Sequence, residues 1–465
     1  MRTLATFVLI SAALTAASAA KIVCYYSSWA IYYEGDGAVQ PEDLDANMCT
    51  HINYAFVSIN SDGCLSAEDE YADIDQGGYK RVVALKEKNS NLKVLLSIGG
   101  ADAPSQTFSQ IAGDAGKRAA MVGSARWFME TYGFDGVDLD WEIPGSGDRA
   151  NFISLLKDFK DDFSRDGWEV SAAVGADVSD GYDVGQMSQI LDHINIMTYD
   201  MYGPWSEYTG QNSPLWASSV ESEWEKDNLN MDAAIRQWRD AGASAGKLIA
   251  GIAFYGHSFT LKDSNNNGLH APIKGAGKGG PIIGEEGSWS YLEFCENRDS
   301  WSCTWDAEQK MPICVSGDQW LGIDDEGSIR NKVAYINSNG LGGAMIWSID
   351  QDDVMRRGSA ALSPATHAHS TSHSQTYTTT FIHPWAPFPD GTRTRADFAV
   401  VAERVLILPS TTLPSAPRRH THIHGPAEIP SFEKILPLRW DSNPLASGPR
   451  PRSTFSDSHA ATEPP

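Results

Sequence analysis

Eight short apolar segments, separated by charged segments with helical spacing, constrain the fold of this chain most strongly. Buried strands that alternate with helices are typical of a parallel α/β sheet, and eight such units predict a (β/α)8 TIM barrel. The predicted strands are 22–28, 50–59, 93–100, 136–142, 169–175, 193–200, 247–256 and 341–350. The predicted helices are 81–89, 116–131, 149–163, 231–241 and 326–337.

The fourth predicted strand carries a row of acidic side chains. It follows Asp135 and holds Asp138, Asp140 and Glu142 at every second position, so these three side chains project from one face. Buried like charges disfavour each other's ionisation, which raises at least one pKa and favours shared protons. A solvated acidic edge is the alternative, but the apolar residues between the acids argue against it. No histidine lies nearby in the sequence, so we expect neither a metal ion nor a cofactor.

Three predicted strands deliver polar or aromatic side chains to the same end of the barrel. Glu142 ends the fourth strand, Asp200 ends the sixth, and Trp347 lies near the end of the eighth. Catalytic groups of such barrels sit at the carboxyl ends of the strands. The sequence therefore predicts that these residues meet in one cleft.

The chain divides into four parts. Residues 1–19 combine Arg2, an apolar run and the small residues Ala17-Ser18-Ala19, which predicts a secretory signal peptide and an extracellular protein. Residues 20–355 form the predicted barrel, interrupted at 257–325 by an inserted α+β subdomain. Residues 356–465 are a low-complexity tail rich in Ser, Thr, Pro and His, which predicts disorder. Its histidines could bind metal adventitiously, but solvated sequence is the preferred interpretation.

Composition limits the partners. With 60 Asp and Glu against 36 Lys and Arg, the formal net charge is −24, which argues against nucleic acid or an anionic membrane surface. No segment is long and apolar enough to predict a membrane span, and we expect a monomer that acts on a neutral ligand. The six cysteines form no C-x-x-C zinc pattern, and a secreted protein can keep disulfides.

The run DGVDLDWE at 135–142 resembles the DxxDxDxE motif of glycoside hydrolase family eighteen, which contains the chitinases and the chitinase-like lectins. Five further segments match the family's strand motifs in the same order, and the resemblance covers about residues 21–353. These segments are CYYSSW at 24–29, SIGG at 97–100, MTYD at 197–200, FYG at 254–256 and GGAMIWS at 342–348. The animal-type, insertion-containing branch fits best.

The resemblance implies substrate-assisted retaining hydrolysis of β-1,4-linked N-acetylglucosamine, an exception to the usual two-carboxylate scheme. Glu142 would protonate the glycosidic oxygen, and the substrate's own acetamido oxygen would attack the anomeric carbon. Asp140 would orient the acetamide, Asp138 would share a proton with Asp140, and Tyr199 would donate a hydrogen bond to the acetamido oxygen. Asp135 would be structural.

The resemblance also implies which residues bind sugar, although core packing is the alternative for each aromatic. The implied substrate contacts are Tyr25, Trp29, Phe56, Met197, Asp200, Trp205, Tyr255 and Trp347, with Trp347 as the floor under the reacting sugar. Gly99 and Gly100 belong to the third-strand motif. Motif position and the nearness of the first two strands imply a Cys24–Cys49 disulfide, and Cys303–Cys314 is a local candidate.

The chain departs from the family pattern at three places. Ala101 stands where the family usually has Trp after Ser-x-Gly-Gly, so we expect weaker binding at the non-reducing end of the cleft. His257 stands where the family usually has Arg, so bracing near Asp200 should depend on pH. After the eighth strand the chain continues into the tail instead of a cysteine and a final helix.

Taken together, the resemblance implies a secreted endo-acting chitinase whose partner is chitin or chitooligosaccharides. The alternative is a non-catalytic chitin-binding chitinase-like lectin or growth factor. Such relatives usually lose the acidic Glu, and this chain keeps Glu142 with both inner aspartates. Hydrolysis of other N-acetylglucosamine glycans is a third option.

Overall fold

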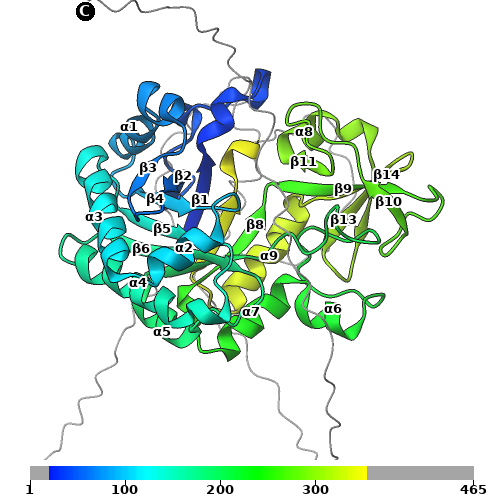
Figure 1. Ribbon diagram of the computed structural model, residues 1–465. Coiled ribbons are helices and arrows are strands. Elements are labelled where there is room, and N and C mark those ends of the chain that lie inside the picture. Colours follow the sequence, from blue (N-terminus) through cyan, green and yellow to red (C-terminus); the bar gives the residue numbers. More distant parts are fainter. Residues whose placement is uncertain (1–19, 353–465) are drawn as a thin grey trace, which may run out of the picture.

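A barrel of eight parallel strands forms the body of the molecule (Figure 1). The computed structural model describes residues 20–352, so the predicted signal peptide and tail lie outside the described residues. The barrel strands are β1 (Lys21–Ser27), β2 (His51–Ile59), β4 (Lys93–Gly99), β5 (Gly136–Asp140), β6 (Glu169–Gly175), β7 (His193–Met197), β8 (Leu248–Ala253) and β15 (Gly343–Trp347). Strand β1 pairs with both β2 and β15, which closes the barrel and confirms the predicted TIM fold.

Helices surround the parallel strands, as Figure 1 shows. They are α1 (Gly78–Val83), α2 (Ser105–Ala112), α3 (Ala115–Tyr132), α4 (Arg149–Phe163), α5 (Val184–Ile190), α6 (Glu223–Asn228), α7 (Met231–Asp240) and α9 (Glu326–Ser338). Each predicted helical segment is helical; the first divides between α1 and the 3-10 segment Ala84–Glu87. Helices α2, α5 and α6 were not predicted.

Four predicted strands extended two or three residues beyond the observed strands at their carboxyl ends. The fourth ends at Asp140, the sixth at Met197, the seventh at Ala253 and the eighth at Trp347. The reason is that the alternation of side chains continues into loops that leave the sheet. Asp200, for example, has φ of 59°, which no strand residue adopts. Glu142 therefore lies two residues beyond the end of β5, whereas the sequence predicted it as the last residue of the strand.

A second, antiparallel sheet follows β8 directly and stands beside the barrel (Figure 1). Its strands are β9 (Tyr255–Leu261), β10 (Ile273–Ala276), β11 (Ser288–Ser290), β12 (Ser302–Asp306), β13 (Met311–Ser316) and β14 (Gln319–Gly322), with helix α8 (Tyr291–Glu296) between β11 and β12. The seventh predicted strand thus spans both sheets, because β9 begins two residues after β8 ends. An inserted α+β subdomain was predicted at 257–325; its sheet is antiparallel and begins slightly earlier, at Tyr255.

Two disulfides lie in the described residues. Cys24 of β1 is bonded to Cys49, which precedes β2, and Cys303 of β12 is bonded to Cys314 of β13. The main core fills the space between barrel and helices, and the apolar residues of β5 belong to it together with Trp141. In the range 20–352, no helix has the length and apolar character that crossing a bilayer requires.

Candidate active site

Asp138 lies inside the barrel and accepts four hydrogen bonds. Tyr25 Oη donates to Oδ2 at 2.6 Å and Ser97 Oγ at 3.0 Å. Ser171 Oγ donates to Oδ1 at 2.6 Å and Asn195 Nδ2 at 3.0 Å. Burial raises the pKa of Asp138, and these four donors act in the opposite direction because they stabilise the carboxylate. Donors from β1, β4, β6 and β7 therefore hold both oxygen atoms of this carboxylate.

Asp140 is the next acid toward the open end of the barrel. It is almost completely buried, and Oδ1 has no hydrogen-bond partner. Burial raises the pKa of Asp140 far above its ordinary value, and the nearby charges of Glu142 and Asp138 raise it further. A buried acid between two others is most stable when it shares or holds a proton.

Glu142 follows the strand and is half-buried. Burial raises its pKa to about 7, and the negative charges of Asp200 and Asp102 contribute in the same direction. A carboxyl group with a pKa near neutrality is still protonated at near-neutral pH and can transfer that proton to a substrate, as a general acid must. Burial thus raises the pKa of all three acids in the row, and Asp138 differs from the other two because its hydrogen-bond donors oppose that shift.

Tyr199 and Asp200 come from the loop after β7. Burial raises the pKa of Tyr199 well above its ordinary value, so its hydroxyl group stays protonated; it lies 3.6 Å from Met345 Sδ. Asp200 Oδ1 contacts the hydroxyl group of Tyr255 and, at 2.8 Å, Nε2 of His257. The side chain of Asn212 accepts from the Asp200 backbone N–H at 2.9 Å, which holds the turn.

Aromatic rings line the mouth of the barrel near these acids. Phe56 and Trp347 are stacked with centroids 5.6 Å apart, and Tyr25 lies 5.4 Å from Trp347. Trp29 contacts both Phe56 and Trp347, at 6.1 and 6.4 Å. Trp29, Met197 and Trp347 are only partly buried, so this cluster presents a ring surface that is not sealed in the core.

Trp205 stands apart from the aromatic cluster. Its side chain is 45% exposed, and its ring meets His257 edge-on at 5.3 Å. Since His257 lies on β9, the inserted sheet contributes one wall near Asp200. Trp205 and the cluster around Trp347 therefore offer ring faces on different elements of the same end of the barrel.

Gly99 and Gly100 let the end of β4 approach its neighbours closely. Both have positive φ, 111° and 90°. A Cβ atom on Gly99 would lie 2.2 Å from the Asp140 carbonyl oxygen, and one on Gly100 would lie 2.5 Å from the Phe56 ring. The Gly100 N–H also donates to the Asp140 carbonyl at 2.9 Å. These glycines therefore hold β4 against the acidic strand.

Asp135 lies at the other end of β5, away from the cluster of acids. Its carboxylate accepts from Val94 N at 2.9 Å and forms an ion pair with Lys86 at 2.8 Å. Lys93 lies 3.6 Å from its second oxygen. These contacts connect the start of β5 to β4 and to the preceding helical segment.

Several residues around the site were missed by the sequence reasoning. Ser171 and Asn195 were treated only as parts of apolar strands, yet both donate to Asp138. The available signal was a single polar residue at an inward position of each strand. Asp102 and Asn212 gave no sequence signal that distinguishes them from ordinary loop residues.

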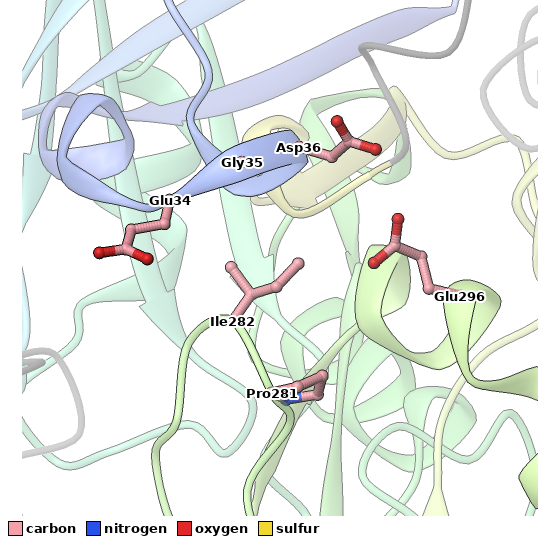
Figure 2. A pocket seen from close by; sticks show the side chains of 6 residues that line it. All are labelled: Glu34, Gly35, Asp36, Pro281, Ile282 and Glu296. Atoms are coloured by element: carbon pink, nitrogen blue, oxygen red, sulfur yellow. The ribbon is translucent and has the colours of Figure 1, made fainter.

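A separate hollow lies between the segment after β1 and the part of the insertion that contains helix α8 (Figure 2). Figure 2 shows that it is lined by Glu34, Gly35, Asp36, Pro281, Ile282 and Glu296. None of the predicted site residues lines it. We therefore assign the candidate active site to the acids and aromatic rings of the barrel and not to this hollow.

The sequence pattern described as "Glycosyl hydrolases family 18" matches residues 21–352, which include the whole barrel and the inserted sheet. The chain belongs to glycosyl hydrolase family 18. The resemblance inferred from the acidic motif is thereby confirmed. This chain has all three inner acids of the motif, Asp138, Asp140 and Glu142, at every second position.

Relatives in family 18 include proteins named as chitinases and one described as a pseudo-chitinase. Chitotriosidase-1 of Mus musculus is 39% identical over 351 residues, which cover 72% of this chain and 74% of the mouse protein. The Ostrinia furnacalis Group IV chitinase, solved in complex with allosamidin, is 37% identical with a TM-score of 0.70 and covers 72% of this chain and 93% of its own. Human YKL-39, described as a pseudo-chitinase with retained chitooligosaccharide binding properties, is 33% identical with a TM-score of 0.68 over 72% of this chain and 94% of its own.

Proposed function

We propose that this family 18 protein is a secreted, endo-acting chitinase that hydrolyses β-1,4-linked N-acetylglucosamine polymers with retention of configuration. The observation that carries the proposal is the intact row of three acids, with the pKa of Glu142 raised to about 7. A binding protein has no need for a carboxyl group that is protonated near neutrality, whereas an acid catalyst does.

In this proposal Glu142 donates its proton to the glycosidic oxygen. The acetamido oxygen of the sugar then attacks the anomeric carbon, so the substrate supplies the nucleophile. Asp140, next to Glu142, stabilises the positive charge that develops on the acetamido group. Tyr199 keeps its proton and donates a hydrogen bond to the acetamido oxygen.

Asp138 serves as the proton partner of Asp140 in this mechanism. The four hydrogen bonds to Asp138 stabilise its carboxylate form, so the shared proton favours Asp140 before the reaction. As positive charge develops on the acetamido group, the proton moves toward Asp138 and Asp140 becomes the counter-ion. This movement places negative charge beside the reacting group when that charge is most useful.

The aromatic cluster supports a sugar ligand. Trp347, stacked on Phe56 and flanked by Tyr25 and Trp29, offers a ring face as a floor for the reacting sugar. Trp205 offers a second exposed face. Two relatives carry names of chitin-degrading enzymes, and the pseudo-chitinase relative is described as binding chitooligosaccharides, so chitin or its oligosaccharides are the proposed ligands.

Secretion and domain boundaries belong to the same proposal. The Cys24–Cys49 and Cys303–Cys314 disulfides are typical of proteins that mature in an oxidising compartment. We infer that residues 1–19 direct secretion, that residues 20–355 form the catalytic unit with its insertion, and that residues 356–465 follow it as a separate tail.

The test compares chitin oligosaccharide hydrolysis by the full chain, by Glu142→Gln and by the matched control Glu34→Gln. We expect Glu142→Gln to lose roughly 10²–10⁴-fold in kcat because the proton donor is gone. The control should retain activity, since Glu34 lines the separate hollow. Product lengths from a long oligosaccharide check endo action. Equal turnover by wild type and Glu142→Gln would remove Glu142 as the acid, and binding without turnover by the wild type would establish the lectin.

A further inference from the structure

Three potential metal ligands meet at the end of the barrel opposite the proposed active site. His51, Glu169 and His193 are the first residues of β2, β6 and β7, so they gather where these parallel strands begin. Both histidines are buried, and Glu169 is partly buried. The proposed hydrolysis makes no use of these residues.

The distances between these side chains suit one small cation. Their potential ligand atoms all lie within 4.8 Å of one another. Oε2 of Glu169 lies 3.2 Å from Nε2 of His51 and 3.8 Å from Nδ1 of His193. In a tetrahedral zinc site with bonds of about 2.0–2.2 Å, neighbouring ligand atoms are roughly 3.3–3.6 Å apart. The three side chains therefore need only small shifts to bind one ion.

A neighbouring threonine orients the ring of His51. Thr50 Oγ1 donates to the Ile22 carbonyl at 3.0 Å, so its lone pair accepts from Nδ1–H of His51 at 2.8 Å. Nε2 of His51 then carries the lone pair that faces Glu169. An oxygen atom that holds the second ring nitrogen is the usual support of a metal-binding histidine.

Lys21 supplies a positive charge at this place. Its Nζ lies 2.9 Å from Nε2 of His51 and 3.3 Å from Oε2 of Glu169, between two acceptors that would otherwise repel each other. His193 is completely buried, and neither of its ring nitrogens has a hydrogen-bond partner. The ammonium group thus satisfies two of the three ligands and leaves the third without a partner, which is costly in a buried position.

We propose that His51, Glu169 and His193 form a binding site for a divalent metal ion of the zinc type, which competes with the ammonium group of Lys21. Such an ion would bind both imidazoles and the carboxylate together, the mixed N and O ligand set that zinc accepts. The side chain of Lys21 is 26% exposed, so it can turn toward solvent when the ion enters. The bound ion would connect three barrel strands at their amino ends and stabilise the fold.

Two variants and one probe test the site. The metal-stripped full chain is titrated with Zn²⁺ by calorimetry, and its melting temperature is measured with and without the ion. His193→Leu removes a ligand, whereas Lys21→Met keeps all three ligands and removes the competing charge. Zinc bound by the histidines of 356–465 is common to all forms, so the difference between forms isolates the barrel site.

We expect Zn²⁺ to raise the melting temperature of the wild type and of Lys21→Met but not of His193→Leu. Lys21→Met should bind roughly 10- to 1,000-fold tighter, the range by which a neighbouring unit charge changes the affinity for a proton. If His193→Leu fails to fold, the comparison of zinc affinity between the wild type and Lys21→Met still tests the site. Equal zinc affinity and stoichiometry in wild type and Lys21→Met, without a shift in melting temperature, would show zinc on the tail only and overturn the site. Turnover of chitin oligosaccharides does not enter this comparison.

Discussion

The four donors around Asp138 set the charge of the innermost acid. They come from β1, β4, β6 and β7, and each stabilises the carboxylate against the effect of burial. Because Ser97, Ser171 and Asn195 are not among the proposed sugar contacts, their contribution to catalysis is expected to act through Asp138 alone. A change in one of them should therefore alter the chemical step and leave binding nearly intact.

We predict that Asn195→Leu shifts the pH dependence of kcat by roughly one to two pH units, with KM little changed, because one lost charge-assisted hydrogen bond is worth roughly 1.5–3 kcal/mol before the site relaxes. The pKa of Asp138 would rise, and Asp140 would hold its proton less firmly. Steady-state kinetics across a pH range checks this. The control is Ser154→Ala, whose hydroxyl group donates to a backbone carbonyl on the exposed side of α4. A rise in KM alone would show that Asn195 acts in binding.

The raised pKa of Glu142 links activity and stability to pH. Because the folded-state value of about 7 exceeds the ordinary 4.5, folding favours the protonated form. This stabilising contribution is fully present below about pH 4.5 and is lost as pH rises through 7. As the acid must be protonated to act, turnover should also decline above about pH 7.

We predict that the free energy of unfolding falls between pH 4.5 and 8 by about 1–3 kcal/mol more in the wild type than in Glu142→Gln, which cannot ionise. Chemical denaturation at several pH values measures this difference. Identical pH dependence of the two proteins would mean that Glu142 does not carry the shift.

At the scale of single residues, the sequence was sufficient to predict the acids of the site but not the residues that donate hydrogen bonds to them. Asp138, Asp140 and Glu142 were recognisable because acids at every second position are unusual in an apolar strand. Ser171 and Asn195 were not, because a lone Ser or Asn in a strand is common, and only the register of β5, β6 and β7 brings them to Asp138.

Strand β4 depends on glycine where it meets β5. Gly99 combines positive φ with a carbonyl oxygen at the place where a Cβ would stand. We predict that Gly99→Ala lowers the free energy of unfolding by about 2–4 kcal/mol, the sum of left-handed backbone strain and overpacking. Hydrolysis should fall as well, since the displaced carbonyl belongs to Asp140.

The matched control is Gly123→Ala in the middle of α3, where a Cβ would meet nothing within 4 Å. That change should stabilise the protein by about 0.5–1 kcal/mol, because alanine favours a helix more than glycine does. Denaturation of both variants under one condition compares them. Equal effects would contradict the close approach of β4 and β5.

A strand or helix could be predicted where its segment was long enough to show the apolar pattern of that element. All eight barrel strands were found because each is a short, strongly apolar run. Helices α2, α5 and α6 were missed because they have 8, 7 and 6 residues, too few for a helical period to stand out. Side-chain caps at Asp183 and Ser222 and tertiary packing hold the latter two in place.

The inserted sheet rejoins the barrel at a buried ion pair. Lys332 of α9 donates to Asp324 at 2.6 Å and to Ser213 Oγ at 2.8 Å, and both charged side chains are almost completely buried. Asp324 lies between β14 and α9, and Ser213 lies in the long segment after β7. This pair thus joins three parts of the chain that are distant in sequence.

We predict that Lys332→Met lowers the free energy of unfolding by about 3–5 kcal/mol, because it leaves Asp324 buried without its counter-ion. The double variant Lys332→Met/Asp324→Leu should regain much of this loss. Arg330→Met on the same helix removes an exposed pair with Glu326 and should cost less than about 1 kcal/mol. Denaturation of the three variants measures these values, and a double variant no more stable than Lys332→Met would contradict the unpaired-charge account.

At the scale of the whole molecule, the number of strands and the presence of an insertion were predictable. The alternation of strands and helices was sufficient for the barrel, and the length of the insertion marked it as a folded unit. The pairing of β14 with β9 and the His51, Glu169 and His193 cluster were not predictable, because they depend on which strand ends meet in space.

The pairing of β1 with β15 sets the order of events during synthesis. Lys21 pairs with Gly343, so the barrel closes only after nearly the whole described chain has left the ribosome. Until then the edges of β1 and β8 stay open, and Trp347 cannot meet Phe56. Nascent chains should therefore need protection from pairing with one another at these edges, and a chain that stops before β15 should not assemble the cleft.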